Sequence, residues 1–345
     1  MTTAVAPTPD LDADRAFGRA MLPHVSRTFA LCIRLLPPDL QEPVTTAYLL
    51  CRIADTIEDA PALDADEKDR LLRHFARTLA GDDLDAAPLA AAFADAQDFE
   101  GKLAAQADTV LRVYRALPEV ERSAIRPWVR EMAGGMAAFA LRHARDGALE
   151  TLDSVEELDQ YCYYVAGTVG HLLTGLFRSR MPRLDPTRAD RLDRLATSFG
   201  IGLQLTNIIK DVADDRRRGW SFVPRDLCEA TGIRPEELQL AEHRGEAREV
   251  MTTLIAKARR HLHDALAYSA TLPVSAYRVR IFCLTSLYFA VRTLRLAERD
   301  PQLLDPRHKV KITRGAVYRT VIATYLVAPF NLLVRAYFRR LDHAR

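Results

Sequence analysis

The sequence has few cysteines and no pair of them at a spacing typical of metal or redox sites. Its five cysteines stand singly, mostly in apolar stretches, so we expect reduced core residues rather than disulfides. They are Cys32, Cys51, Cys162, Cys228 and Cys283. This usage predicts a cytoplasmic protein.

The first residues lack both parts of a signal peptide, a basic region and an apolar core. The acidic residues that follow argue against an organelle transit peptide, so we expect no export. Residues 1–9 contain two prolines and no helical periodicity, which predicts a disordered tail.

The chain also lacks a linker rich in Gly, Ser or Pro and shows no change of hydrophobic period. We therefore expect a single domain over residues 10–315, although a length of 345 residues would allow two. The net charge is only +2, and no basic stripe is interleaved with aromatics, so we expect no nucleic-acid partner.

Helical periodicity extends along almost the whole chain, which predicts an all-α fold. Helices are expected to begin near residue 11, after the cap residue Ser26, near Ser154 and near Thr187. Further helices are predicted over 40–59, 64–80, 86–116, 119–146, 235–243, 246–270 and 274–299.

The most informative stretch is 199–218, where polar side chains follow one face of an otherwise apolar helix. Gln204, Asn207, Asp211 and Asp215 recur at spacings of three, four and four. A charge held against an apolar bundle costs several kcal/mol unless a cation neutralises it. Two carboxylates one turn apart in such a helix therefore predict a divalent metal.

A second stretch has the same pattern. Tyr48, Arg52, Asp55 and Asp59 share one helical face, with Glu58 beside them. Helical bundles build metal sites from facing helices. An ordinary solvated surface is the alternative, and the presence of two such helices in apolar sequence weighs against it.

A tyrosine-rich helix carries Tyr161, Tyr164 and His171 on one face. Gly167 and Gly170 remove side chains where something bulky could pass. The alternative is that buried tyrosines simply find hydrogen-bond partners in the core.

The C-terminal segment 316–345 is predicted to form a helix. Its uncharged part, Thr320 to Val334, is too short for the roughly 20 residues that span a bilayer, and arginines flank it. Contact with an anionic membrane surface and a core position in the bundle are equally open interpretations. The segment 308–315 before it is a basic loop, which could also be an ordinary solvated charge cluster.

Mg²⁺ held by acidic helices in an apolar cavity suits the departure of a diphosphate from an allylic carbon. The carbocation left behind must be shielded from water by aromatic and aliphatic walls. Prenyl diphosphates fit such a pocket better than sugars or nucleotides.

Three segments resemble motifs of the squalene and phytoene synthase family: 55–59, 161–167 and 204–215. The resemblance covers roughly residues 20–315. It implies a single-domain isoprenoid-synthase helical bundle around a central cavity, and head-to-head joining of two prenyl diphosphates through a cyclopropyl intermediate.

Within that family, the segments 26–29, 48–52 and 310–315 resemble squalene synthases more than phytoene synthases. This implies condensation of two farnesyl diphosphates to presqualene diphosphate, followed by reduction to squalene with NADPH. The family pattern has a basic residue where Thr313 stands, so the NADPH loop departs from it there.

The resemblance also implies roles for individual residues. Tyr161 would pass the proton during cyclopropane formation, with Arg52 and Tyr48 assisting catalysis. The Mg²⁺ ligands would be Asp55, Glu58, Asp59, Asn207, Asp211 and Asp215. Substrate contacts would come from Ser26, Arg27, Phe29, Arg52, Tyr164, Gln204 and Phe282. NADPH contacts would come from Asn207, Lys210, Lys311 and Arg314.

Two alternatives remain open. The same first half-reaction could end in dehydrosqualene, phytoene or presqualene diphosphate, without hydride transfer. The chain could also be a non-catalytic helical assembly protein, although such a protein has no need of the ligand carboxylates. The sequence leaves the oligomeric state and the prenyl chain length undetermined.

Overall fold

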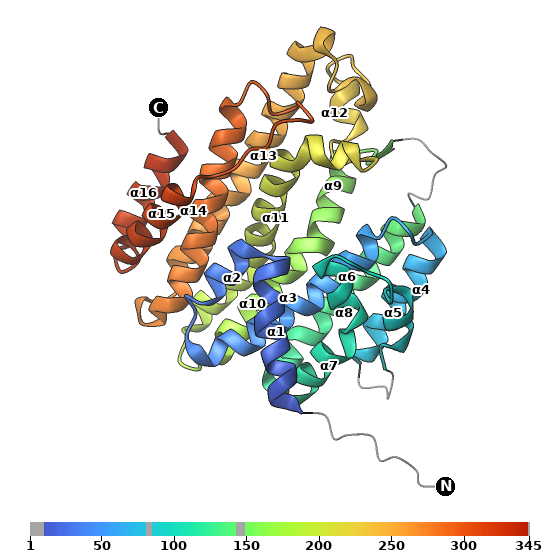
Figure 1. Ribbon diagram of the computed structural model, residues 1–345. Helices are drawn as coiled ribbons and strands as arrows, with labels where there is room; N and C mark the ends of the chain where they lie inside the picture. Colours follow the sequence, from blue (N-terminus) through green and yellow to red (C-terminus); the bar gives the residue numbers. More distant parts are fainter. Residues whose placement is uncertain (1–9, 81–84, 143–148, 344–345) are drawn as a thin grey trace. The chain divides into compact units, whose positions relative to one another are not determined.

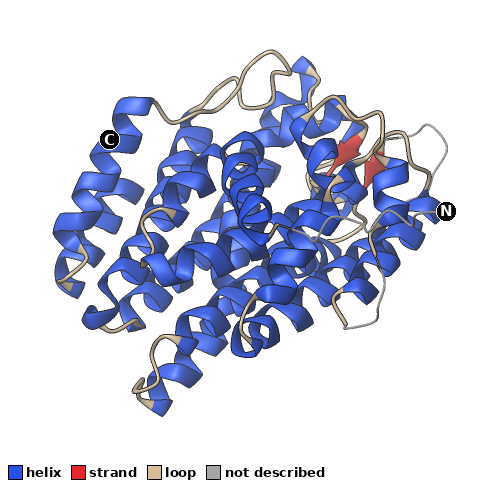
Figure 2. Ribbon diagram, turned by 60° about the horizontal axis from the view of Figure 1, so that its bottom comes forward, coloured by secondary structure: helices blue, strands red, loops and turns tan. Residues whose placement is uncertain are grey.

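The computed structural model describes residues 10–80, 85–142 and 149–343 (Figure 1). Across these residues the chain is helical apart from turns and two strands of two residues each (Figure 2). The predicted all-α class is confirmed. The predicted disordered tail, 1–9, lies outside the described residues.

The chain forms two compact units, residues 1–137 and 138–345. The sequence predicted one domain over 10–315, and that division stays an interpretation. In the first unit, α3 (Pro38–Asp59) packs against α1, α4, α6 and α7. The helices of this unit are α1 (Leu11–Val25), α2 (Arg27–Ile33), α3, α4 (Ala65–Thr78), α5 (Ala87–Ala92), α6 (Phe99–Ala105), α7 (Ala107–Ala116) and most of α8 (Glu119–Arg142).

In the second unit, α11 (Pro186–Arg217) lies against α13, α10 and α14. Its first turn begins with proline, where the missing N–H costs nothing, and Asp185 caps it. The other α-helices are α9 (Val155–Cys162), α10 (Thr168–Ser179), α12 (Arg225–Glu229), α13 (Arg244–Thr271), α14 (Tyr277–Arg299), α15 (Arg314–Val327) and α16 (Asn331–His343).

Short elements complete this unit. The 3₁₀ turns are η2 (Pro235–Glu237), η3 (Ala241–His243) and η4 (Val274–Ala276), and η1 (Tyr163–Gly167) is a π-helix between α9 and α10. The strands β1 (Glu150–Thr151) and β2 (Trp220–Ser221) pair in parallel and join the end of α11 to the start of α9.

Several predicted helix boundaries were wrong. The predicted helix 86–116 is three helices, because Asp98 caps a new start by accepting from the Gly101 N–H at 2.6 Å and Gln106 ends α6. The predicted helix 235–243 is two separate 3₁₀ turns. The C-terminal segment is two helices, α15 and α16, with Pro329 in the turn between them.

The glycines of the tyrosine-rich segment were also misread. A Cβ atom at Gly170 would lie 2.0 Å from the carbonyl oxygen of Ala196, and one at Gly200 would lie 1.9 Å from that of Ala166. These glycines let the backbone of α11 approach η1 and α10, so they do not leave room for a ligand.

We expect Gly200→Ala to lower the melting temperature, because the added methyl group must push two backbones apart at a cost of about 1–3 kcal/mol. Gly134→Ala is the matched control, since nothing lies within 4 Å of its added Cβ in helix α8. The control should be neutral or gain about 0.5–1 kcal/mol from helix propensity. Equal melting temperatures for the two variants would show that the close helix crossing is unimportant.

Candidate active site

In the first unit, the predicted catalytic residues of α3 contact one another. Arg52 donates to the Tyr48 hydroxyl at 2.8 Å and lies 3.6 Å from the Asp55 carboxylate. Tyr48 in turn stacks on Phe29, with ring centroids 5.1 Å apart. The i, i+3 and i, i+4 spacings of the helix make these contacts.

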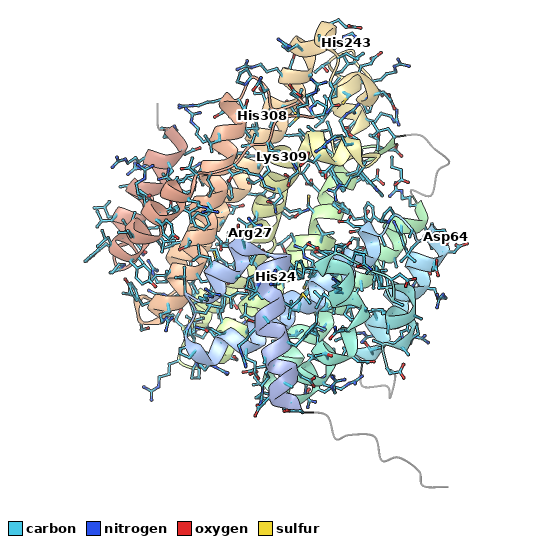
Figure 3. The ribbon with its side chains drawn as sticks, viewed as in Figure 1. His24, Arg27, Asp64, His243, His308 and Lys309 are labelled. Atoms are coloured by element: carbon cyan, nitrogen blue, oxygen red, sulfur yellow. The ribbon has the colours of Figure 1, made fainter. Side chains whose placement is uncertain are left out.

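Helix α2 places Phe29 on Tyr48. Ser26 caps this helix by accepting from the Phe29 N–H at 3.2 Å, as its sequence position predicted. Arg27 is exposed at the first position of α2 (Figure 3). The predicted substrate residues 26, 27 and 29 therefore lie on one short helix beside Tyr48 and Arg52.

The carboxylate of Asp55 is held in an environment that disfavours its charge. Burial raises its pKa to about 6, and Asp59 one turn later adds to this, although Arg52 opposes it. Burial also opposes the charge on Arg52, but Asp55 and Tyr48 together raise the Arg52 pKa. Glu58 is half-buried and Asp59 is exposed in the last turn of α3.

In the second unit, cations of the chain lie beside the acids of α11. Asp211 pairs with Lys210, and the buried Asp215 is 2.5 Å from Arg218. Gln204 is half-buried and Asn207 exposed on the same helix. The predicted stripe 204, 207, 211 and 215 thus lies along one helix, and its carboxylates are already paired.

The sequence analysis did not identify Asp214 as a site residue. It pairs with Arg217 and with Lys309 at 2.6 Å, and these partners lower its pKa even though burial opposes its charge. Lys309 belongs to the basic loop 308–313, which this ion pair joins to α11. The loop is adjacent to the second acidic stretch, a contact that nothing in the local sequence could predict.

The same loop carries Lys311, one of the four predicted NADPH residues, and leads into Arg314, which is another. Lys311 is exposed, and Arg314 is the first residue of α15. Figure 3 labels His308 and Lys309 of the same loop. Thr313 caps α15 by accepting from the Ala316 N–H at 3.2 Å. Thr313, where the family pattern has a basic residue, therefore begins a helix here.

Tyr161 lies on α9 among aromatic rings, and only 7% of it is exposed. Phe222 stacks on it at 4.8 Å between centroids, and Phe139 meets it edge-on at 5.4 Å. Tyr164, in the π-helix, also meets Phe139 edge-on at 6.2 Å. The aromatic cluster of Tyr161, Tyr164, Phe139 and Phe222 includes two phenylalanines that the sequence analysis did not identify.

A local irregularity shapes this cluster. π-helical turns are rare and occur frequently at functional sites, and here one turn holds Tyr163 to Gly167. The β1–β2 pair brings Phe222 near α9, with the Glu150 N–H donating to the Gly219 oxygen at 2.9 Å. Phe282, by contrast, is 1% exposed and packs edge-on against Phe177, so it is a core residue of α14.

The donor set fits Mg²⁺ within each unit. Magnesium is bound by one or two carboxylates and completes its shell with phosphate oxygens and water. Among the described residues, no group of three or more His, Cys, Asp or Glu is placed to hold a metal, so each unit offers a carboxylate pair rather than a full cage. Asp55 with its raised pKa is a group that a cation would stabilise in the charged form.

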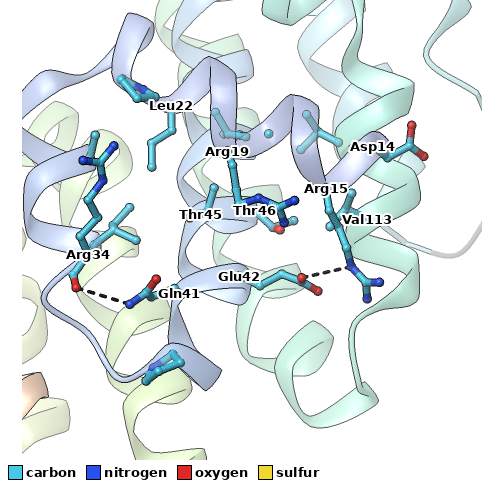
Figure 4. Close-up of a pocket in the computed structure, with 17 residues that line it drawn as sticks. Asp14, Arg15, Arg19, Leu22, Arg34, Gln41, Glu42, Thr45, Thr46 and Val113 are labelled. Carbon is cyan, nitrogen blue, oxygen red and sulfur yellow. Dashed lines mark hydrogen bonds and ion pairs between the residues drawn. The ribbon is translucent and has the colours of Figure 1, made fainter. Parts of the chain in front are cut away.

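A separate cavity of about 360 Å³ lies in the first unit between α1, α2, α3 and α7 (Figure 4). Arg15 pairs with Glu42 at 3.1 Å along its wall, and Gln41 donates to the Leu36 oxygen at 3.0 Å. None of the predicted site residues lines this cavity.

Comparison with known proteins bears on the whole chain. Residues 22–316 match the family described as squalene/phytoene synthase. The chain belongs to this family. The match begins before α2 and ends just after the basic loop, so it includes every predicted site residue.

The relatives agree with one another. Squalene synthase of Schizosaccharomyces pombe is 30% identical over 306 residues, which is 88% of this chain and 63% of that protein. The probable squalene synthase of Neurospora crassa is 31% identical over 90% of this chain and 61% of its own length. The chain thus spans less than two thirds of these fungal relatives.

The solved structure of TcSQS with the ligand BPH1237 is 28% identical, with a TM-score of 0.81 over 97% of this chain and 93% of that one. The isoprenoid-synthase fold is confirmed.

The raised pKa of Asp55 predicts a pH-dependent stability. Between about pH 4 and 6 the Asp55 carboxyl holds a proton in the folded protein and releases it in the unfolded chain. The stability that this proton confers is therefore lost as the pH rises through about 6. We expect Asp55→Asn to be more stable than wild type at pH 7.5 by about 1–3 kcal/mol, and equal to it near pH 4.

Chemical denaturation at the two pH values checks this, and added Mg²⁺ should stabilise the wild type more than the variant. A variant less stable than wild type at pH 7.5 would contradict the environment described for Asp55.

Proposed function

We propose that the chain is a squalene synthase: it condenses two farnesyl diphosphates head to head into presqualene diphosphate and reduces this product to squalene. The observation that carries the proposal is the pairing of carboxylates with cations of the chain on α3 and on α11. The relatives named squalene synthase support the same reaction.

The carboxylates of the two acidic stretches would hold Mg²⁺, with Asp55 and Asp59 on α3 and Asp211 and Asp215 on α11, assisted by Glu58 and Asn207. When bound, Mg²⁺ neutralises a diphosphate and stabilises the charge that leaves with it. Asp55 is suited to this part because its pKa of about 6 is raised by burial and by Asp59.

The cations that pair with these acids could also bind the diphosphate. Arg52 and Lys210 now neutralise Asp55 and Asp211, respectively. A bound metal would take over that neutralisation, which leaves both side chains able to donate to the oxygens of a diphosphate. Arg27, exposed on α2, would supply a further positive charge.

Tyr161 is the residue proposed to pass the proton that the carbon skeleton loses, when the cyclopropane ring closes, to the departing diphosphate. Its surroundings suit a cationic reaction, because Phe222 and Phe139 exclude water and their ring faces attract positive charge. Tyr164 extends the same aromatic wall.

NADPH would supply the hydride for the second half-reaction. Lys311, Arg314, Lys210 and Asn207 are the residues proposed to bind its phosphates. The Lys309–Asp214 ion pair supports this assignment, since it holds the loop that carries Lys311 next to α11.

The reaction would take place in the cytoplasm, at or near the inner face of a membrane. A product formed without hydride transfer, such as dehydrosqualene, is the main alternative. The Lys309–Asp214 contact favours the NADPH-dependent reaction, because the loop of Lys311 would have no role in the alternative.

We expect incubation with farnesyl diphosphate and Mg²⁺ to give presqualene diphosphate without NADPH, and squalene with it, by mass analysis. Tyr161→Phe should lower formation of the intermediate at least about 100-fold while the fold is retained. Tyr268→Phe is the control: this buried tyrosine bonds Thr174 at 2.8 Å, so its loss should cost about 1 kcal/mol of stability and no activity. Normal turnover in the Tyr161 variant would remove that residue from the mechanism.

Lys311→Ala should raise the KM for NADPH about 10- to 100-fold, since a hydrogen bond to a charged phosphate contributes about 1.5–3 kcal/mol. The rate of presqualene diphosphate formation should stay unchanged. Arg307→Ala, an exposed cation of the neighbouring turn, is the matched control. An unchanged KM in the Lys311 variant would place the cofactor elsewhere.

A further inference from the structure

Helix α15 buries polar side chains and exposes apolar ones, which is the reverse of an ordinary amphipathic surface helix. Its inner face is formed by Thr320 and Thr324, both fully buried, and each hydroxyl donates to the carbonyl four residues earlier at 2.7–2.8 Å. Its outer face carries Tyr318, Ile322 and Leu326, which are 67%, 62% and 69% exposed. A surface helix of a soluble protein normally buries its apolar stripe instead.

This face belongs to a firmly packed element. The fully buried Arg280 of α14 donates to the Ala328 oxygen at 3.0 Å and to Asn331 at 2.7 Å, and it bonds the Leu272 oxygen at the end of α13. Tyr288 of the same helix donates to the Val334 oxygen at 3.1 Å. The turn between α15 and α16 is therefore fixed on α13 and α14, and the exposed side chains are not part of a frayed end.

The exposed apolar side chains of these two adjacent helices and of the turn between them are together called the α15–α16 face (Figure 1 shows the two helices side by side). It consists of Tyr318, Ile322, Tyr325, Leu326, Phe330, Leu332 and Leu333. These are seven of the thirteen large hydrophobic residues exposed in the described part of the chain. Exposed apolar side chains concentrated in this way mark an interaction surface.

The exposed charges on α15 and α16 themselves are of one sign. The exposed arginines are Arg314, Arg319, Arg335, Arg339 and Arg340. Within the described residues from 314 onward, the one carboxylate is Asp342, which is buried and bonds Arg259 at 2.9 Å. Leu332, Arg335 and Arg339 recur at three and four residues, so cations and apolar side chains share one side of α16.

We infer that the α15–α16 face docks on an anionic lipid bilayer. The apolar side chains would enter the boundary between headgroups and acyl chains, and each arginine would contribute about 1 kcal/mol at an anionic surface. A second copy of the chain fits poorly, because a symmetric contact would bring five arginines against five of the same charge. The inference goes beyond the proposed reaction and does not depend on it.

The contact is peripheral. Helix α15 has 14 residues, too few to cross a bilayer. In the described part of the chain, the one segment long and apolar enough to do so is Val274–Arg299, and 72% of its apolar window is buried within the protein. That segment is a core helix, which leaves the α15–α16 face as the surface available to lipid.

Co-sedimentation of the full chain with lipid vesicles tests this inference. We expect binding to phosphatidylcholine vesicles that contain phosphatidylglycerol, little binding to phosphatidylcholine alone, and release by high salt. The variant Ile322→Ser/Leu326→Ser/Leu332→Ser should bind at least about tenfold more weakly at an unchanged melting temperature. Arg335→Gln/Arg339→Gln should lose the preference for the anionic lipid.

The matched control is Val120→Ser/Leu240→Ser/Val274→Ser, which changes exposed apolar residues elsewhere (55%, 44% and 50% exposed) and should bind like wild type. Equal binding of the control and the α15–α16 variant, or no binding of wild type to anionic vesicles, would overturn the inference. The inference would also be overturned if wild type were a dimer in sedimentation velocity and the α15–α16 variant were a monomer. Diphosphate release from farnesyl diphosphate, measured without vesicles, should be the same in all variants and is read separately.

Discussion

Carboxylates set beside fully buried apolar side chains on α3 and α11 are the constraint on which this structure depends. Helix α3 buries Ile53 and Ile57 fully, yet carries Asp55 between them. Helix α11 buries Ile208, Ile209 and Val212, and its acids follow the same turns. Such charges are unfavourable in a protein interior unless each is neutralised. On both helices the chain offsets part of this cost with its own cations, and at Asp55 burial still outweighs the effect of Arg52.

This neutralisation connects stability to function. Arg52, Lys210, Arg218 and Lys309 each pair with a carboxylate of one acidic stretch. A cation bound by the acids would release these side chains toward an anionic ligand. The ion pairs that offset buried charge in the ligand-free fold are therefore the side chains proposed to meet a diphosphate, and on α11 the Lys309–Asp214 pair joins that helix to the loop of Lys311.

The sequence predicted the parts whose signal is local. The helices that carry the two acidic stretches were predicted correctly because the helical pattern is local, and the contact of Arg52 with Asp55 follows from the same spacing. The cap at Ser26 was correct for the same reason. Gly170 was misread, since only the crossing of two helices reveals that the backbone at Ala196 occupies the space above it.

Other features depend on contacts between distant segments. The pairing of Lys309 with Asp214 joins residues that are 95 positions apart by their numbers, and Phe222 reaches Tyr161 through the short β1–β2 pair. The sequence also did not reveal that α15 exposes its apolar side chains. An uncharged segment with flanking arginines is compatible with either a core or a surface position. The burial of Thr320 and Thr324 decides between them.

The acids of α3 and those of α11 are each proposed to bind diphosphate through divalent cations. The most direct measurement is a crystal structure of the chain with farnesyl thiodiphosphate and Mn²⁺, in which anomalous scattering locates the metal. We expect manganese at Asp55 and Asp59 and at Asp211 and Asp215, with Arg52 and Lys210 each turned from its acid to a diphosphate. Manganese at other residues, or a diphosphate bound while the present ion pairs persist, would contradict this proposal.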